Sequence, residues 1–265
     1  MTGSSTGEGH LEGRCALVTG GTDGVGFDVA ERLARRGAHV VITGRDAGRG
    51  AKALTRMGPL AGTVSFEQGD ASDPAEITDL VERVRSSHGD AIDMLVSAGS
   101  GHNVGPTPFA DLTFEQISQE IDTLLHARLF PVKAALPALR VRGGSVVMLT
   151  TDAARYPTPG ESIIGAVGAA VILSTKALAR EFSRWSIRVN SVAMTITSDT
   201  PSWDRAFAGE TFQSRLFSKA VDRFPQGRAP TAGEVAAVAE HLATEMSQVT
   251  GQTISVNGGL SFGGW

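Results

Sequence analysis

The chain has 265 residues, of which 41% are apolar and 20% charged, so it is long enough to bury a sizeable core. Its 24 Lys and Arg against 28 Asp and Glu give a net charge of −4, which argues against a nucleic-acid-binding surface. The single cysteine, Cys15, excludes an internal disulfide framework and a multi-cysteine zinc site, and it indicates a reducing cytoplasm. No His, Cys, Asp and Glu residues have the spacing of metal ligands, so we expect no metal site.

The first ten residues, MTGSSTGEGH, are polar and lack the apolar core of a signal peptide, so we expect them to form a flexible tail. Residues 11–265 contain no internal repeat, low-complexity stretch or break in composition, which predicts one domain. No stretch approaches the roughly 20 apolar residues that cross a bilayer, so we expect neither a membrane-spanning segment nor a membrane partner.

Short apolar runs alternate with helix-sized segments along the chain. The run AHVVIT at residues 38–43 lacks period-two alternation and is typical of a parallel strand covered on both faces. The alternation predicts an α/β fold, with one doubly wound, Rossmann-type parallel sheet and helices on both faces. Predicted strands occupy residues 15–19, 38–43, 64–68, 92–97, 145–150, 187–193 and 253–256, and predicted helices run through residues 27–34, 75–87, 113–141, 162–185 and 231–246.

Asp73-Pro74 and Pro230-Thr231 predict helix starts, since Asp and Thr cap helices and Pro suits the first helical position. Between the last two predicted strands, residues 198–223 carry several aromatic side chains at helical spacing. We interpret this segment either as an amphipathic lid over the substrate side of the sheet or as aromatic residues that pack against the core.

Residues 19–26, TGGTDGVG, form a glycine-rich turn between the first predicted strand and the first helix. Glycines there let the backbone approach a pyrophosphate, whose charge is stabilised by the positive helix N-terminus. The alternative is a turn that only joins a strand to a helix. The predicted cofactor-binding residues of this turn are Gly20, Thr22, Asp23, Gly24, Val25 and Gly26.

Arg45 follows the second predicted strand, where an NAD-preferring site places an acid for the ribose hydroxyls. An arginine suits the 2′-phosphate of NADP(H) instead, so we expect that cofactor. Asp23 opposes this interpretation by adding a negative charge, and the alternative for Arg45 is a solvated surface charge.

Further motifs are Asp70 in GDASD after the third predicted strand, SAG at residues 97–99 and RVNSVA at residues 188–193. With the glycine turn, they make residues 11 to about 260 resemble the short-chain dehydrogenase/reductase family. The resemblance implies a seven-stranded parallel sheet, Asp70 and Ala71 near the adenine, and Ser97, Ala98 and Gly99 along the cofactor. It also implies a homodimer or homotetramer built on the helices at residues 113–141 and 162–185.

Active members of this family resemble one another in a Ser, a Tyr and a Lys, with an Asn on the preceding long helix. In that mechanism the Tyr protonates the carbonyl oxygen, the Lys lowers the pKa of the Tyr, and the Ser holds the oxygen. The matching positions here are Thr151, Ile164 and Gly168, at unchanged spacing, and Leu124 replaces the Asn. The only tyrosine, Tyr156, has no lysine four residues later, so realignment does not restore the pair.

The candidates for replacement chemistry each have a structural alternative. The Thr151 hydroxyl either holds the substrate oxygen, as the family's Ser does, or satisfies backbone groups at the end of a strand. The Tyr156 phenol either reaches a substrate or belongs to an aromatic side chain that only packs in the loop. Glu161 lies seven residues before Gly168, the spacing between Tyr and Lys in the related enoyl reductases, or is a helix N-terminal carboxylate stabilised by the dipole. His102 contacts substrate or is an exposed loop residue.

Three functions stay open from the residues alone. The first is an NADP(H)-dependent oxidoreductase acting on a carbonyl or enone, with Thr151 or Tyr156 polarising the oxygen. The second is a cyclase, isomerase or dehydratase that needs no redox step, and the third is a catalytically silent partner of an active homologue in a hetero-oligomer. The apolar replacements indicate a largely apolar small-molecule substrate, and the small side chains of residues 165–170 suit packing across a subunit interface.

Overall fold

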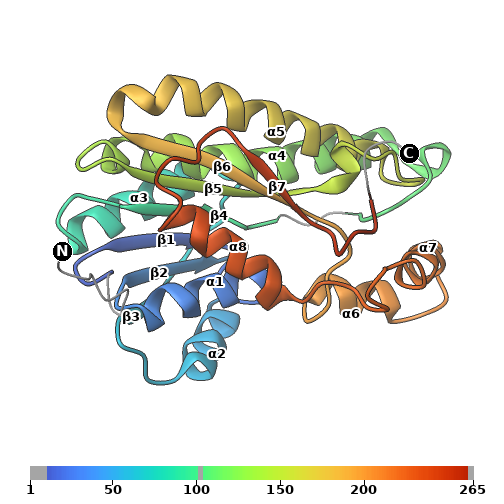
Figure 1. The fold of residues 1–265 in the computed structure, drawn as a ribbon, viewed down its shortest axis with the longest axis horizontal. Helices are drawn as coiled ribbons and strands as arrows, with labels where there is room; N and C mark the ends of the chain where they lie inside the picture. The colour runs from blue at the N-terminus through green and yellow to red at the C-terminus, as the bar shows by residue number, and fades with distance from the viewer. Residues whose placement is uncertain (1–10, 101–103, 262–265) are drawn as a thin grey trace, which may run out of the picture.

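A seven-stranded parallel sheet lies at the centre of the computed structural model, which describes residues 11–100 and 104–261 (Figure 1). The strand order is β3-β2-β1-β4-β5-β6-β7, so the chain crosses between the two halves of the sheet after β3 and places β4 beside β1. The predicted fold class is confirmed, while the predicted tail at residues 1–10 lies outside the described residues. The strands are β1 Cys15–Thr19, β2 His39–Gly44, β3 Thr63–Gln68, β4 Met94–Ser97, β5 Gly144–Thr151, β6 Ile187–Met194 and β7 Thr253–Val256.

Helices cover both faces of the sheet (Figure 1). Leu17 and Val18 are both fully buried, but Leu17 joins the core beneath α3, α4 and α5, whereas Val18 joins the core beneath α1 and α8. A strand that packs on two cores has no polar face, which explains why its sequence does not alternate. The helices are α1 Gly24–Arg35, α2 Ala47–Met57, α3 Pro74–Ser87, α4 Phe114–Leu139, α5 Ser162–Phe182, α6 Pro201–Phe207, α7 Phe212–Val221 and α8 Ala232–Ala243.

Two predicted helix starts are confirmed, and one helix was missed. Asp73 caps α3, and Thr231 caps α8 in a reciprocal pair with Glu234. The missed helix is α2, whose sequence AGRGAKALTRM holds two glycines and buries only three residues. One of them, Gly50, is required by packing, because a Cβ there would lie 2.5 Å from the ring of Phe66.

The expectation that no segment is long and apolar enough to cross a membrane was wrong for one helix. Residues Ser162–Trp185, which comprise α5 and a short 3₁₀ turn, reach a mean hydropathy of 1.8 over an 18-residue window. In the fold this segment packs against β5, β6 and α4, and buries Val167, Val171 and Phe182 in the core. In that window 33% is buried, so core packing explains the apolar residues on the inner face of the helix.

The aromatic segment at residues 198–223 forms two short helices, α6 and α7, beyond the carboxyl ends of the strands (Figure 1). Trp203, Phe207 and Phe217 pack in a small cluster with Ile196 and Phe224. The interpretation of these side chains as core packing is therefore confirmed for this local cluster.

α7 also contacts the loops at the carboxyl ends of the strands. The Gln213 side chain donates a hydrogen bond to the Val104 carbonyl, and a Cβ at Gly160 would lie 2.5 Å from the ring of Phe212. The segment thus covers this end of the sheet, as a lid over the substrate side would.

Asp93 joins three central strands at the opposite, amino-terminal edge of the sheet. Its buried carboxylate accepts a 2.8 Å hydrogen bond from the Cys15 N–H at the start of β1. It also accepts hydrogen bonds from Arg14 at 2.8 Å and from Arg142, before β5, at 2.7 Å. Burial and the Asp93 charge together raise the pKa of the Cys15 thiol to about 12, so the thiol is neutral.

We expect Asp93→Ala to lower the free energy of unfolding by about 3 kcal/mol, because it leaves a buried N–H and two guanidinium groups without their acceptor. Urea denaturation followed by circular dichroism measures the loss. Asp79→Ala is the matched control, because Asp79 is exposed in the middle of α3, where Ala is favoured, so its loss should stay below about 0.5 kcal/mol. Equal losses for the two variants would contradict the role of Asp93.

Candidate functional site

The glycine-rich turn lies where the carboxyl ends of β1 and β4 meet, at the crossover of the sheet, which is where open parallel sheets bind ligands. Gly20 has a φ of 67°, and a Cβ there would lie 2.6 Å from the Cα of Gly99. A Cβ at Gly26 would overlap the Gly20 carbonyl oxygen. Side chains are therefore excluded at these positions, and a ligand can approach the backbone closely.

The turn leads directly into the N-terminus of α1. Asp23 caps this helix by accepting a 2.9 Å hydrogen bond from the Gly24 N–H, and its carboxylate lies 3.3 Å from the Arg56 guanidinium. The negative charge of Asp23 is thus offset by a cation and by the helix N-terminus. A Cβ at Gly44 would lie 3.0 Å from the Thr22 methyl, whereas the Val25 side chain packs into the core.

Arg45 directly follows β2 and keeps 39% of its side chain exposed. Its nearest acidic partner is Asp70, at 3.8 Å, which is longer than a hydrogen bond, while the neighbouring Asp46 is engaged in capping α2. Ala71 is buried, with its Cβ 3.6 Å from the position that a Cβ of Gly99 would take. The structure therefore places the turn after β3, which contains Ala71, beside the turn after β4, which contains Gly99.

Residues 97–99, at the end of β4, form hydrogen bonds with Thr19 of β1 and with α4. The Ala98 N–H donates to the Thr19 carbonyl, and the Gly99 N–H donates to the Thr19 hydroxyl, each at 3.2 Å. The Ser97 hydroxyl donates to the Ala127 carbonyl of α4 at 3.0 Å. The predicted cofactor residues at the ends of β1 and β4 thus form one surface, whose glycine cradle fits a dinucleotide.

Thr151 ends β5 and lies directly against Gly168 of α5. A Cβ at Gly168 would lie 2.6 Å from the Thr151 methyl and 3.0 Å from the Ala154 Cβ. The two positions matched to the family's Ser and Lys are therefore in contact, but no longer side chain fits at Gly168. The interpretation of Gly168 as a subunit-interface residue was wrong, because its missing side chain would point into its own chain.

The Thr151 hydroxyl accepts a 3.1 Å hydrogen bond from the Ala153 N–H, as expected for a strand-end residue that satisfies a backbone group. The hydroxyl still has a proton of its own to donate. Leu124 and Ile164, matched to the family's Asn and Tyr, are both partly buried.

Glu161 immediately precedes α5, but its side chain makes no capping hydrogen bond with the helix. Burial raises the pKa of the Glu161 carboxyl to about 7, against the smaller, opposing effect of a hydrogen bond with Thr158. Its place at the N-terminus of α5 agrees with the alternative of a helix N-terminal carboxylate, and burial opposes the stabilising effect of the helix dipole. With this pKa, the Glu161 carboxyl is partly protonated at neutral pH.

The remaining candidates are less defined. Tyr156 is half-buried in the loop between β5 and α5, and no residue in the described part of the chain forms a hydrogen bond with its phenol. His102 lies outside the described residues. Across residues 11–100 and 104–261, no group of three or more His, Cys, Asp and Glu side chains is placed to hold a metal ion.

Two charged residues that sequence reasoning missed flank Leu124 on α4. Glu120 is 2% exposed; one carboxylate oxygen accepts hydrogen bonds from the N–H groups of residues 104–105, and burial raises its pKa. The Arg128 Nε donates a 2.6 Å hydrogen bond to the Leu149 carbonyl. Their spacing of four residues about Leu124 places all three on one helix face, which was the available signal.

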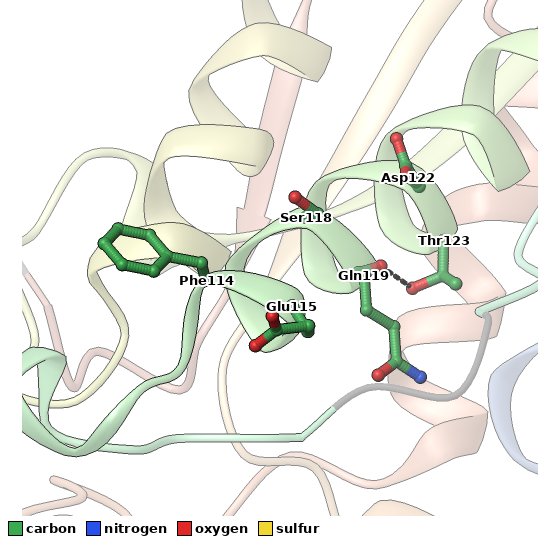
Figure 2. A pocket seen from close by; sticks show the side chains of 6 residues that line it. All are labelled: Phe114, Glu115, Ser118, Gln119, Asp122 and Thr123. Atoms are coloured by element: carbon green, nitrogen blue, oxygen red, sulfur yellow. Dashed lines mark hydrogen bonds between the residues drawn. The ribbon is translucent and has the colours of Figure 1, made fainter.

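An open hollow of about 540 Å³ lies along the first turns of α4 (Figure 2). It contains none of the predicted cofactor or catalytic residues, so we do not assign it to the site. Its lining residues are Phe114, Glu115, Ser118, Gln119, Asp122 and Thr123.

Comparisons with known proteins agree with this geometry. The family model described as enoyl-(acyl carrier protein) reductase matches residues 20–261. A 3-oxoacyl-acyl-carrier-protein reductase of Chlamydia pneumoniae is 29% identical over 259 residues, covering 95% of this chain and 98% of that protein. A tropinone reductase homologue of Arabidopsis thaliana is 34% identical over 258 residues, covering 96% and 93%.

A solved structure is similar over nearly the same length. A short-chain type dehydrogenase/reductase from Mycobacterium ulcerans matches with a TM-score of 0.85 at 27% identity, over 94% of this chain and 90% of that one. Proteins of this kind are typically oxidoreductases with a nicotinamide cofactor, which the cradle between β1 and β4 fits. The chain belongs to the short-chain dehydrogenase/reductase family.

Proposed function

We propose that the protein is a cytoplasmic NADP(H)-dependent reductase of a small, largely apolar carbonyl or enone compound that works without the Tyr and Lys of its relatives. The observation that carries the proposal is the cradle at Gly20 and Gly26, where side chains are excluded beside a helix N-terminus and Gly20 lies against Gly99. Such a cradle suits the pyrophosphate of a dinucleotide. The cofactor, when bound, supplies the hydride, and the chain must hold the substrate and supply a proton.

The charges around Arg45 support NADP(H) over NAD(H). The residue after β2 is a cation, its loose contact with Asp70 leaves guanidinium N–H groups to bind a phosphate, and Asp46 is occupied at the start of α2. Asp23, which opposed this preference in the sequence, is paired with Arg56. The cofactor preference therefore depends mainly on Arg45.

Thr151 and Glu161 are the residues we assign to proton chemistry. The Thr151 hydroxyl donates a hydrogen bond to the substrate oxygen, at the position matched to the family's Ser. Glu161 gives its carboxyl proton to the substrate as negative charge develops there, and it recovers a proton from water. Burial provides the raised pKa that this role needs, in place of a coupled Tyr and Lys.

We further propose that the protein assembles as a homodimer or homotetramer through α4 and α5. Phe114 and Ile121 on α4 and Leu173 on α5 are 87%, 41% and 68% exposed, which is costly for large apolar side chains in water. Their burial between copies of the chain would offset that cost.

The test of the cofactor proposal is calorimetric titration with NADPH and, separately, NADH. We expect NADPH to bind at least about tenfold more tightly, and Arg45→Ala to weaken NADPH binding about 10- to 100-fold with little effect on NADH, since charge-assisted hydrogen bonds to the phosphate are lost. Arg35→Ala, which removes an exposed cation at the far end of α1, is the control. Absence of binding to both dinucleotides would overturn the proposed function.

The raised pKa of Glu161 predicts a pH-dependent effect on stability. Between pH 4.5 and about 7 the unfolded chain loses the Glu161 proton while the folded chain keeps it, so stability falls as pH rises through this window. Glu161→Gln should therefore gain melting temperature relative to the wild type from pH 4.5 to 7, with no further gain above. Glu115→Gln is the control, because Glu115 is exposed and its pKa is lowered. A constant difference across the window would refute the assignment.

We expect Gly168→Ala to destabilise the protein by about 1–2 kcal/mol. The helix preference for Ala contributes about 1 kcal/mol, but a methyl group 2.6 Å from the Thr151 methyl forces repacking that costs more. Gly233→Ala in α8 is the matched control, because its Cβ meets nothing closer than 3.6 Å, and it should be neutral or stabilising. Thermal unfolding measures both, and a stabilised Gly168→Ala would show that the vacated lysine position is open.

A further inference from the structure

Arg128 projects its charge to the carboxyl ends of β4 and β5, where the substrate site lies. Its backbone is held over β4, since the Ser97 hydroxyl donates to the carbonyls of Ala127 and Arg128. Its Nε donates a 2.6 Å hydrogen bond to the Leu149 carbonyl in β5. Leu149 precedes Thr151 by two residues in the same strand, a rise of about 7 Å. The guanidinium is therefore bound to the same strand, two residues before the hydroxyl assigned to the substrate oxygen.

This charge has no acidic partner among residues 11–100 and 104–261. Its Nη1 is buried without an acceptor, while the residue as a whole is only partly buried. Glu120, on the same face of α4, is two helical turns away, about 12 Å along the axis, and bonds instead to residues 104–105. Burial lowers the pKa of Arg128 to about 10, so the guanidinium is still charged at neutral pH.

A desolvated cation without a counter-charge is unfavourable, and a ligand with a full negative charge offsets that cost. With Nε already occupied, the guanidinium has its Nη1 and Nη2 edge left, whose parallel N–H groups match the two oxygens of a carboxylate. The neighbouring Leu124 and Ile164 offer only apolar contact.

We propose that Arg128 is a substrate-binding residue, and that the substrate is a monocarboxylate with an apolar body: an oxo- or enoyl-carboxylate whose acid group lies on Arg128. This inference rests on the proposed function for the reduced group near Thr151. The inference specifies in addition that the substrate carries a negative charge, which neither the cofactor cradle nor the absence of the Tyr and Lys determines.

Calorimetric titration with benzoate and with benzamide, its uncharged analogue, tests the inference without knowledge of the true substrate. Titrations are made with the full chain, alone and with NADPH present. We expect benzoate to bind at least about tenfold more tightly than benzamide to the wild type, and Arg128→Met to abolish the difference. Arg128→Lys keeps the charge but not the planar guanidinium, so it should retain part of the preference for benzoate. This variant serves as the test if Arg128→Met does not fold.

Arg140→Met is the matched control, because Arg140 is at the C-terminal end of α4 and stacks on Trp185 instead of facing the site. Equal affinities for benzoate and benzamide in the wild type, no binding of benzoate, or unchanged benzoate affinity in Arg128→Met would each overturn the inference. The readout needs no turnover, so the two proposals fail separately. If NADPH binds but benzoate is not preferred, only the proposal that Arg128 binds a carboxylate is rejected. If benzoate is preferred but neither dinucleotide binds, only the proposed reductase function is rejected.

Discussion

The close approach of two backbone segments at the ends of β1 and β4 is the constraint on which the rest of the molecule depends. Gly20 and Gly99 are so near that a Cβ on Gly20 would lie 2.6 Å from the Cα of Gly99, and the Thr19 hydroxyl accepts a hydrogen bond from the Gly99 N–H. Because α1 begins four residues after Gly20, this contact also aims the positive helix end at the crossover of the sheet. The same contact therefore joins the segments after β1 and β4 at the centre of the sheet and shapes the glycine cradle.

On the substrate side of the fold, Gly168 is packed against Thr151 with no space for a methyl group, and the apolar side chains of Leu124 and Ile164 are partly buried. The charged groups on this side include Glu161 before α5 and Arg128 on α4. Burial raises the pKa of Glu161 and lowers the pKa of Arg128, so desolvation distinguishes both groups from exposed side chains of the same type.

α4 links the two halves of the site. Its backbone accepts the Ser97 hydroxyl at the end of β4, Arg128 reaches across to β5, and Glu120 holds the backbone at residues 104–105. Any movement of this helix therefore changes the cofactor side and the substrate side together. The exposed apolar residues on α4, among them Phe114 and Ile121, connect the same helix to the proposed assembly.

The sequence by itself determined the seven strands, their order of succession with the helices, and the cofactor turn, because apolar runs and glycine turns are local signals that survive any environment. It missed α2, whose glycines weaken the helix signal until Phe66 packs on Gly50. It could match Thr151 to Gly168 by spacing, but not decide that Gly168 faces its own strand instead of a partner subunit.

Only the tertiary structure decided the charges of the site. Glu161 reads as an ordinary helix-start carboxylate, and Arg128 as one of 24 basic residues, until burial is known. Desolvation depends on which distant segments cover a side chain, and for Arg128 one of them is β5, whose Leu149 carbonyl accepts the hydrogen bond from Nε. That information is not local in the sequence, which is why the fold was predictable and the charge environment of the candidate site was not.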